Sequence, residues 1–321
     1  MHTRPLFRNG PPVSVIGLSL SSPPTSSQPL NQLALIAPAS EDPTQSGEDK
    51  RAATIARARE LGVNLFDTDW ITANGHAQEV LGRALHGTDR DSVFVTSKAG
   101  PRLAFHGELL IDNSRANLIN QCHDSLFRLK TDRIDLYQVH WPDDTSPIQT
   151  ARGLQDLVSG GYATWVGVCN YGLPQLEALA GHVKLQTVQA PLNVLNRKSL
   201  QLIEWCNTRG VGFLASDPLL SGLLNGKFTG NEEFTDTDRD EYFSQPKFGQ
   251  AVAFASDLAA LDKHTPGQWA VAWALAQGAA SVLVQAADVA DFDELAHAAE
   301  IELSDQELAT LDALVQKHGL L

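Results

Sequence analysis

The sequence predicts one α/β domain in which eight parallel strands close into a barrel surrounded by helices. Short runs rich in β-branched and aromatic residues recur eight times, and segments with helical spacing lie between them. No glycine-rich phosphate loop follows the first run, although a doubly wound open sheet commonly carries one there. At 321 residues and 43% hydrophobic, the chain suffices for one barrel with enlarged loops, so residues 1–321 are interpreted as a single domain.

The predicted strands and helices alternate in chain order. The strands cover residues 13–18, 63–66, 93–96, 134–139, 164–168, 185–188, 212–215 and 281–284. The clearest helices cover residues 49–61, 114–129, 199–208 and 267–277. Most of these helices begin at Ser, Asp or Gly, and strands that alternate with helices are joined by right-handed crossovers and run parallel. The predicted fold class is therefore a (β/α)8 TIM barrel.

Two loops and the tail elaborate this barrel. Residues 21–48 are rich in Ser, Pro and Gln and predict an enlarged loop after strand one. Residues 225–249 are acidic and follow strand seven, where long loops shape or cover the pocket, so we expect a lid. In the tail, Ser304 precedes Glu307 by three residues at the start of a run with apolar helical spacing. This pattern predicts a C-terminal helix packed against the barrel.

Charge and cysteine usage narrow the class of partner. The formal net charge is −14, from 38 acidic and 24 basic side chains, which disfavours nucleic acid and anionic membranes as partners. The three cysteines, Cys122, Cys169 and Cys206, show no CxxC spacing, so neither disulfides nor a metal site is expected. The N-terminal residues lack a secretory pattern, and the sequence predicts a cytoplasmic protein that acts on a small molecule.

Three polar side chains follow predicted strands at the end where barrel enzymes carry their chemistry. Asp67, Lys98 and His140 stand at the ends of strands two, three and four. Each has an alternative role, respectively as a helix cap, a surface charge or a core histidine. Together they favour a site, because an Asp keeps a neighbouring Lys charged and a His exchanges protons near neutral pH. Such a group suits polarising or protonating a carbonyl oxygen.

Five ordered motifs resemble the aldo-keto reductase family and cover roughly residues 10–318. GVNLFDTDWITANGHAQEVLGRAL resembles its G-x-N-x-F-D-T-A-x-x-Y-G-x-G-x-S-E-x-x-L-G-x-A-L pattern and places Asp67 on the family's active-site aspartate. VFVTSKAG places Lys98 on its lysine, and RANLINQCHDSLFRLKTDRIDLYQVHWPD places His140 on its histidine. VGVCNYGLPQLE and FLASDPLLSGLLNGKF resemble two further family segments. The resemblance implies reduction of a carbonyl by NADPH or NADH.

The family's tyrosine is absent from this sequence. Five residues after Asp67, at the position of that tyrosine, stands Thr72. In the family a tyrosine phenol, acidified by the lysine, protonates the carbonyl, and a threonine hydroxyl is far too weak an acid for this. The nearest ionisable side chains are Asp69 and His76, and Trp70 can fill the space of the phenol. Thr72 is interpreted either as a spacer or as a residue that holds a water.

The cofactor positions implied by the resemblance are mixed. They fall on Cys169, Asn170, Gln189, Ser216, Asp217 and Leu219. Asn170 and Gln189 match the contacts to the nicotinamide carboxamide, and Cys169 replaces a serine. Ser216 stands where an aromatic residue stacks on the nicotinamide, and Asp217 replaces a serine near the pyrophosphate, where a carboxylate repels phosphate.

The segment after strand eight also departs from the family. Asp288, Asp291 and Asp293 occur where the family carries polar or basic residues for the adenosine 2′-phosphate. NADPH is therefore expected to bind weakly, unless Lys227 or Lys247 compensates.

Three functional hypotheses follow. The first is a divergent reductase of a small carbonyl or sugar-like compound, in which His140 or a water on Thr72 supplies the proton. The second is a redox-independent dehydratase, epimerase or lyase without a nicotinamide cofactor, with a Schiff base at Lys98 as a variant. The third is a non-catalytic binding or regulatory barrel. Substrate specificity is expected from residues 21–48, the predicted lid, and the loop containing Trp141, Asp143 and Asp144.

Overall fold

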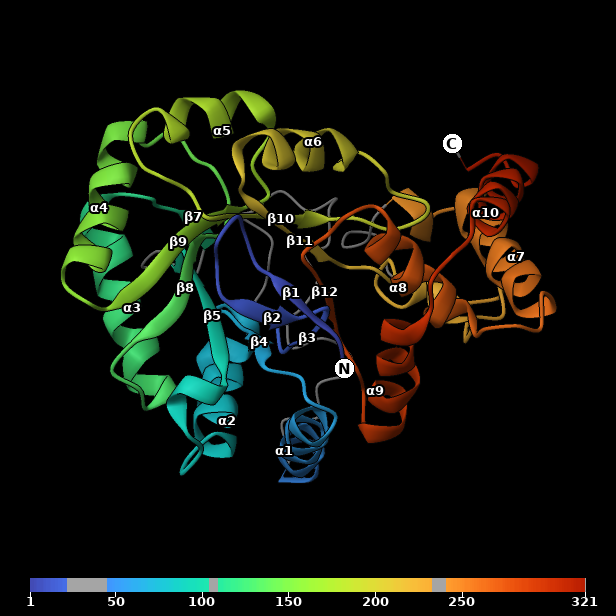
Figure 1. Cartoon of the computed structure of the whole chain (residues 1–321), viewed down its shortest axis with the longest axis horizontal. Helices are drawn as coiled ribbons and strands as arrows, with labels where there is room; N and C mark the ends of the chain where they lie inside the picture. The colour runs from blue at the N-terminus through green and yellow to red at the C-terminus, as the bar shows by residue number, and fades with distance from the viewer. Residues whose placement is uncertain (22–44, 104–108, 233–240, 321) are drawn as a thin grey trace.

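The computed structural model describes residues 1–21, 45–103, 109–232 and 241–320. Its centre is a closed barrel of parallel strands in the order β10-β11-β12-β3-β4-β5-β8-β9 (Figure 1). These strands are β3 (Ile16–Ser19), β4 (Leu65–Asp67), β5 (Phe94–Ala99), β8 (Ile134–Val139), β9 (Ala163–Cys169), β10 (Thr187–Pro191), β11 (Gly212–Ser216) and β12 (Ser281–Val284). Each overlaps one predicted strand, and the predicted TIM barrel is confirmed.

Helices form the outer layer of the barrel (Figure 1). They are α1 (Gln45–Glu60), α2 (His76–Ala84), α3 (Arg115–Leu129), α4 (Pro147–Ser159), α5 (Leu173–Ala180), α6 (Leu200–Arg209), α7 (Lys247–Ala260), α8 (Pro266–Ala276), α9 (Val289–Ala296) and α10 (Asp305–Lys317). Short 3-10 helices are η2 (Thr72–Gly75), η3 (Arg90–Ser92), η4 (Leu223–Asn225), η5 (Glu241–Phe243) and η6 (His297–Glu300). Within the described ranges, no helix combines the length and apolar character needed to cross a membrane.

The first predicted strand, residues 13–18, is in fact two strands. Its first part is β2 (Pro12–Ser14), which pairs antiparallel with β1 (Thr3–Pro5), and only β3 enters the barrel. The hairpin closes the N-terminal end of the barrel, because Leu6 and Val13 join the apolar cluster inside it. The other buried members of that cluster are Leu65, Phe94, Leu136, Leu214, Ala280 and Leu283.

Inward-facing side chains change character along the strands. On β5, Phe94 belongs to the apolar inner cluster, whereas Lys98, four residues on, is buried among polar groups. On β4 the same change occurs over two residues, from Leu65 to Asp67. Because side chains alternate along a strand, residues separated by an even number share a face. The carboxyl end of the barrel therefore holds a polar layer above an apolar plug.

The two long loops lie partly outside the described residues. Of the segment 21–48, residues 22–44 are not described, and α1 begins at Gln45, so the helix starts earlier than predicted. Of the segment 225–249, residues 233–240 are not described, while its flanks are packed. Phe243 and Phe248 are buried, and the Tyr242 hydroxyl donates to the Leu195 carbonyl at 3.0 Å. Whether this segment acts as a lid stays a prediction.

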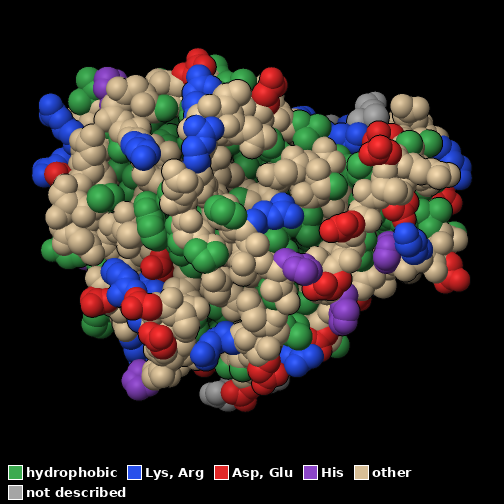
Figure 2. All heavy atoms as spheres, in the orientation of Figure 1, with side chains coloured by type: hydrophobic (Ala, Val, Ile, Leu, Met, Phe, Trp, Pro, Cys, Tyr) green, Lys and Arg blue, Asp and Glu red, His purple; other side chains and the backbone are tan. Residues whose placement is uncertain are grey.

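The predicted C-terminal helix is confirmed as α10. Ser304 accepts from the Glu307 N–H at 3.3 Å, and the Glu307 side chain accepts from the Ser304 N–H at 2.8 Å, which completes the capping box. On the molecular face shown in Figure 2, acidic and basic side chains are interspersed rather than gathered into a basic patch.

Candidate active site

A buried ion pair joins the ends of β4 and β5. Lys98 Nζ lies 2.6 Å from Asp67 Oδ1, and each side chain is 1% exposed. The parallel register of β4 against β5 sets Asp67 beside Thr96, so that Lys98, two residues further on the same face, reaches the carboxylate. Two buried opposite charges in contact hold each other ionised, since either alone in this interior is unfavourable.

Every oxygen and donor of this pair is occupied. Asp67 Oδ1 also accepts from the Thr96 hydroxyl, and Oδ2 accepts from Ser19 Oγ at 3.0 Å and from Ser21 Oγ at 3.4 Å. Lys98 Nζ additionally donates to the Thr68 carbonyl at 3.1 Å and to Ser21 Oγ at 3.3 Å. The pair is thus held in a fixed geometry by hydroxyls from two strands and the segment after β3.

Opposing effects set the pKa of Lys98. Burial by itself lowers this pKa, but the charge of Asp67, with smaller effects from Cys169 and Asp69, outweighs burial and raises it above the ordinary value. Lys98 is therefore an ammonium group near neutral pH. This state suits polarising an oxygen and opposes the Schiff-base variant, which requires a free amine.

His140, directly after β8, presents a neutral imidazole. Burial, and then the positive charge of Lys98, lower the pKa of His140 well below its ordinary value of 6.5. Its backbone is fixed on both sides, since its N–H donates to the Ala99 carbonyl at 2.7 Å and its carbonyl accepts from Asn170 Nδ2 at 3.0 Å. The ring stacks on Trp141 with centroids 3.6 Å apart. A neutral imidazole held this way can donate one N–H to a carbonyl oxygen.

Thr72, at the position of the family's tyrosine, is buried in a short 3-10 turn. Its backbone N–H donates to Asp69 Oδ1 at 2.7 Å, so Asp69 caps η2. Asp69 itself has no exposed surface, and its Oδ2 has no hydrogen-bond partner in the described structure. The indole Nε1 of buried Trp70 is likewise unpaired among those residues.

The second ionisable side chain near this turn, His76, is engaged elsewhere. Its Nε2 lies 2.9 Å from Glu48 Oε1 on α1, and its Nδ1 lies 3.5 Å from Glu79 Oε2 on α2. His76 therefore joins the two outer helices, and Asp69 is the ionisable group that the loop buries.

The predicted nicotinamide contacts form one corner of the polar layer. Gln189 on β10 is buried, and within the described ranges its Oε1 has no donor. The Asn170 N–H donates to the Gln189 carbonyl at 2.9 Å, with Asn170 in the left-handed region at φ +60°. Cys169, the preceding residue, is buried, and burial raises the pKa of its thiol. A buried acceptor without a donor is unfavourable, and a carboxamide NH2 group would satisfy Gln189.

The predicted pyrophosphate end is occupied by the chain's own carboxylate. Asp217 follows β11 at φ +49°, and its Oδ1 accepts from the Ser221 N–H at 2.6 Å. Ser216 is partly exposed at the strand end, and Leu219, in the same turn, packs against the core. A backbone donor that a phosphate could use is thus already paired with an anion.

The segment predicted to meet the adenosine is acidic, and two of its three carboxylates pair with cations. Asp288 caps α9 by accepting from the Asp291 N–H at 3.0 Å, Asp291 pairs with Lys227, and Asp293 pairs with Arg57 Nε at 2.7 Å. Lys227 does reach this segment, as the sequence suggested. Sequence reasoning missed Arg57, which arrives on α1 from a distant part of the chain.

Lys247 is the other lysine that the sequence analysis named as a possible partner of the 2′-phosphate, and it contacts a different group. Its Nζ lies over the Tyr242 ring, 5.2 Å from the centroid.

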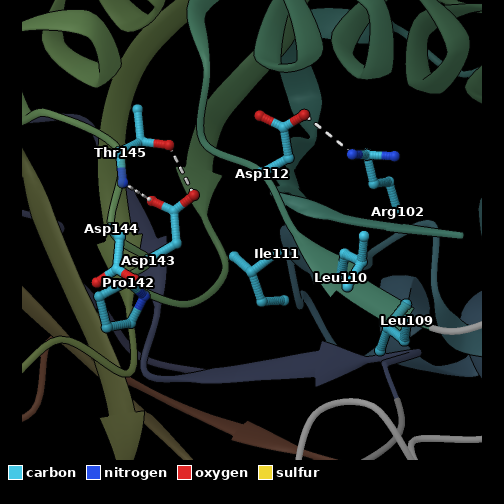
Figure 3. Close-up of a pocket in the computed structure, with 9 residues that line it drawn as sticks. All are labelled: Arg102, Leu109, Leu110, Ile111, Asp112, Pro142, Asp143, Asp144 and Thr145. Carbon is cyan, nitrogen blue, oxygen red and sulfur yellow. Dashed lines mark hydrogen bonds and ion pairs between the residues drawn. The ribbon is translucent and has the colours of Figure 1, made fainter. Parts of the chain in front are cut away.

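An open groove of about 630 Å³ lies between the β6–β7 hairpin and the loop after β8 (Figure 3), and Asp67, Lys98 and His140 are not among its lining residues. The hairpin strands are β6 (Pro101–Leu103) and β7 (Leu109–Ile111). The lining residues are Arg102, Leu109, Leu110, Ile111, Asp112, Pro142, Asp143, Asp144 and Thr145.

Carboxylates outnumber cations in this groove. Arg102 is the one cation among the lining residues, and its Nε lies 3.0 Å from Asp112 Oδ2 (Figure 3). Asp143 accepts from the Thr145 hydroxyl at 2.7 Å. Asp144 is exposed at the rim. The groove is therefore apolar on the hairpin side and net negative, which disfavours an anionic occupant.

The fold and the polar layer define a class of protein, a parallel β/α barrel with a buried Asp–Lys pair at the carboxyl ends of its strands. No group of three or more His, Cys, Asp and Glu side chains in the described ranges is arranged to hold a metal. The model of the aldo/keto reductase family matches residues 37–316. The chain belongs to the aldo/keto reductase family, whose members include oxidoreductases.

Individual relatives agree with this assignment. The chain is 31% identical over 249 residues to an aldo-keto reductase of Bacillus subtilis (strain 168), covering 74% of this chain and 75% of that protein. It superposes on the glycerol dehydrogenase of Gluconobacter oxydans with a TM-score of 0.83 and 26% identity, covering 99% and 96% of the two chains. An aldo/keto reductase from Klebsiella pneumoniae in complex with NADP and acetate shares the fold, with a TM-score of 0.71, 24% identity and coverage of 97% and 94%.

Proposed function

We propose that this protein reduces a small, uncharged carbonyl compound with a nicotinamide cofactor and a proton donor other than tyrosine. The observation that carries the proposal is the buried Asp67–Lys98 pair, 2.6 Å apart, beside the neutral His140. An ammonium and an imidazole N–H at one barrel mouth stabilise the negative charge that develops on a carbonyl oxygen during reduction.

The residues present fit the nicotinamide end of the cofactor. When bound, the reduced nicotinamide supplies hydride, and Gln189 and Asn170 would hold its carboxamide. The unpaired Gln189 Oε1 supports this assignment, since it lacks a donor among the described residues. A neighbour of the same fold is described in complex with NADP.

We further propose a preference for NADH over NADPH. Arg57 and Lys227, the cations found at the adenosine end, already pair with Asp293 and Asp291. A 2′-phosphate would have to compete with these carboxylates and face the Asp288 side chain at the start of α9. NADH places no such charge there.

The groove between the β6–β7 hairpin and the loop that follows His140 supports the choice of an uncharged substrate. Its acidic residues, Asp112, Asp143 and Asp144, face a single guanidinium. A carboxylated or phosphorylated aldehyde would meet net negative charge, whereas a hydroxylated or partly apolar aldehyde would not.

The test is reduction of aldehydes by the purified protein. The loss of NADH absorbance measures the rate. We expect turnover of an uncharged aldehyde and weaker turnover of its carboxylated analogue. Asp144→Lys should narrow that difference by roughly threefold, while Asp132→Lys, the same charge change at an exposed turn before β8, should leave it unchanged. Absence of turnover for every aldehyde, with NADH bound, would refute the reductase proposal.

A second candidate, redox-independent acid/base chemistry, has one specific observation in its favour. Asp217 and Asp288 occupy backbone donors at the two places where the family binds phosphate groups of the cofactor. In that case the Asp67–Lys98 pair and His140 would serve a dehydratase, epimerase or lyase reaction. Failure of both NADH and NADPH to bind would favour this candidate.

A further inference from the structure

The carboxyl group of Asp69 is a buried acid that the family resemblance does not explain. In the matching family motif the residue after F-D-T is alanine, and here it is aspartate. Asp69 has no exposed surface, and its two oxygens have different surroundings. Oδ1 accepts from the Thr72 N–H at 2.7 Å, whereas Oδ2 has no partner anywhere in the described structure.

The other ionisable groups of the site are already committed. Both oxygens of Asp67 accept hydrogen bonds, and Lys98 is saturated by Asp67, Thr68 and Ser21. Burial and the charge of Lys98 lower the pKa of His140, so it is neutral and its remaining N–H is a weak acid. Of Asp67, Asp69, Lys98 and His140, only Asp69 combines an acidic group with an oxygen that has no hydrogen-bond partner among the described residues.

Charge balance indicates where a proton resides. Asp67, Asp69 and Lys98 are all nearly or completely buried, so none of the three is stabilised by water. One ammonium balances one carboxylate, and Asp67 is the carboxylate in contact with it. A second carboxylate without a partner would be costly to bury, and a proton on its free oxygen removes that cost.

We propose that Asp69 is the proton donor that replaces the missing phenol, an inference that rests on the proposed reductase function. A bound reduced nicotinamide would supply hydride to the carbonyl carbon, and the C=O π electrons would move to oxygen. That oxygen takes the proton from Asp69 Oδ2, so an O–H bond forms on the alcohol product and one breaks on Asp69. The resulting carboxylate takes a proton from water before the next turnover. Thr72 positions the donor by holding Oδ1 through its N–H.

A capping role alone would also place an aspartate here, because Asp69 caps η2. The variant Asp69→Asn separates the two roles, since its amide oxygen can still accept from Thr72 while its NH2 group is not an acid. Asp89→Asn is the matched control. Asp89 caps the 3-10 helix η3 by accepting from the Asp91 N–H, on a turn before β5 at the opposite end of the strand from Lys98.

We expect Asp69→Asn to lower kcat for aldehyde reduction by about 100-fold or more, with the KM for NADH and the melting temperature close to those of wild type. Asp89→Asn should leave kcat unchanged. A kcat for Asp69→Asn within twofold of wild type would overturn the proposal.

Infrared difference spectroscopy supplies a test that needs no turnover. Wild type minus Asp69→Asn should show the C=O stretch of one protonated carboxyl group near neutral pH, and wild type minus Asp89→Asn should not. Absence of that band overturns the assignment of Asp69 as a proton donor whatever the effect on kcat. If wild type reduces no aldehyde, the proposed function fails, and the infrared comparison still decides the protonation of Asp69.

Discussion

The two ends of the proposed cofactor path differ in how their hydrogen-bonding groups are satisfied. At the proposed nicotinamide end, near β4, β5 and β10, Gln189 Oε1 and Asp69 Oδ2 are buried without hydrogen-bond partners within the described structure. At the phosphate end, after β11 and β12, the carboxylates of Asp217 and Asp288 fill backbone donors. The comparison teaches that polar atoms remain unpaired at the first end, whereas the chain's own carboxylates already pair with backbone donors at the second.

This difference has a simple electrostatic basis. Buried acceptors without donors favour a ligand that brings N–H or O–H groups. A helix start or turn already capped by a carboxylate offers less to an anion, since the anion must displace a negative side chain that is covalently tethered nearby.

The largest expected effect comes from breaking the ion pair at the nicotinamide end. Lys98→Met leaves the Asp67 carboxylate buried without a cation, which should cost ~3–5 kcal/mol in the free energy of unfolding. It should also lower kcat for aldehyde reduction by about 10³-fold, because the positive charge whose field stabilises the developing oxyanion is lost. Urea unfolding and single-turnover kinetics measure the two effects.

The double variant Asp67→Asn with Lys98→Met is the control for stability. It should recover most of the lost unfolding free energy and none of the activity. If Lys98→Met alone were as stable as wild type, the claim that Lys98 compensates the buried charge of Asp67 would be wrong.

The second prediction tests the proposed phosphate end by placing the family's serine at position 217. Asp217→Ser removes one negative charge near the expected pyrophosphate and should tighten NADH binding by about fivefold. Calorimetric titration measures it, with Asp132→Ser as the matched surface control. Unchanged affinity in Asp217→Ser would separate Asp217 from the cofactor path.

A smaller effect is expected in the pH dependence of folding stability, through the buried imidazole of His140. Burial lowers the pKa of His140 in the folded state below 6.5, so the unfolded chain binds more protons as the pH falls below that value. Folding stability should therefore be fully present above about pH 6.5 and decline as the pH falls towards the folded pKa.

The variant His140→Gln isolates this contribution. Between pH 7 and pH 5.5, wild type should lose a few tenths to about 1 kcal/mol more unfolding free energy than His140→Gln. Equal losses in urea titrations at the two pH values would show that His140 is not buried in its neutral form.

Local sequence patterns predicted the barrel because each element carries its own signal. Ser114 caps α3 by accepting from the Asn117 N–H, and the Ser304–Glu307 capping box begins α10, both at the predicted residues. The N-terminal hairpin was not separated from the first strand, since Ser14 and Val15 continue the same β-rich run. The β6–β7 pair was also missed, because each of its two strands is only three residues long.

The site was predictable only where a strand end fixes it. Asp67, Lys98 and His140 could be placed together because parallel strands bring their carboxyl ends to one mouth. The pairing of Arg57 with Asp293 depends on how α1 packs near α9, which no local pattern encodes. The unpaired oxygen of Asp69 is equally a tertiary fact, since the sequence shows an aspartate but not whether a donor faces it.

The most direct measurement is titration of the protein with NADH and with NADPH. Nicotinamide fluorescence and calorimetry measure the binding. The proposed function predicts saturable binding of NADH and a weaker affinity for NADPH. Binding of neither nucleotide would contradict it and would leave the Asp67–Lys98 pair to redox-independent chemistry.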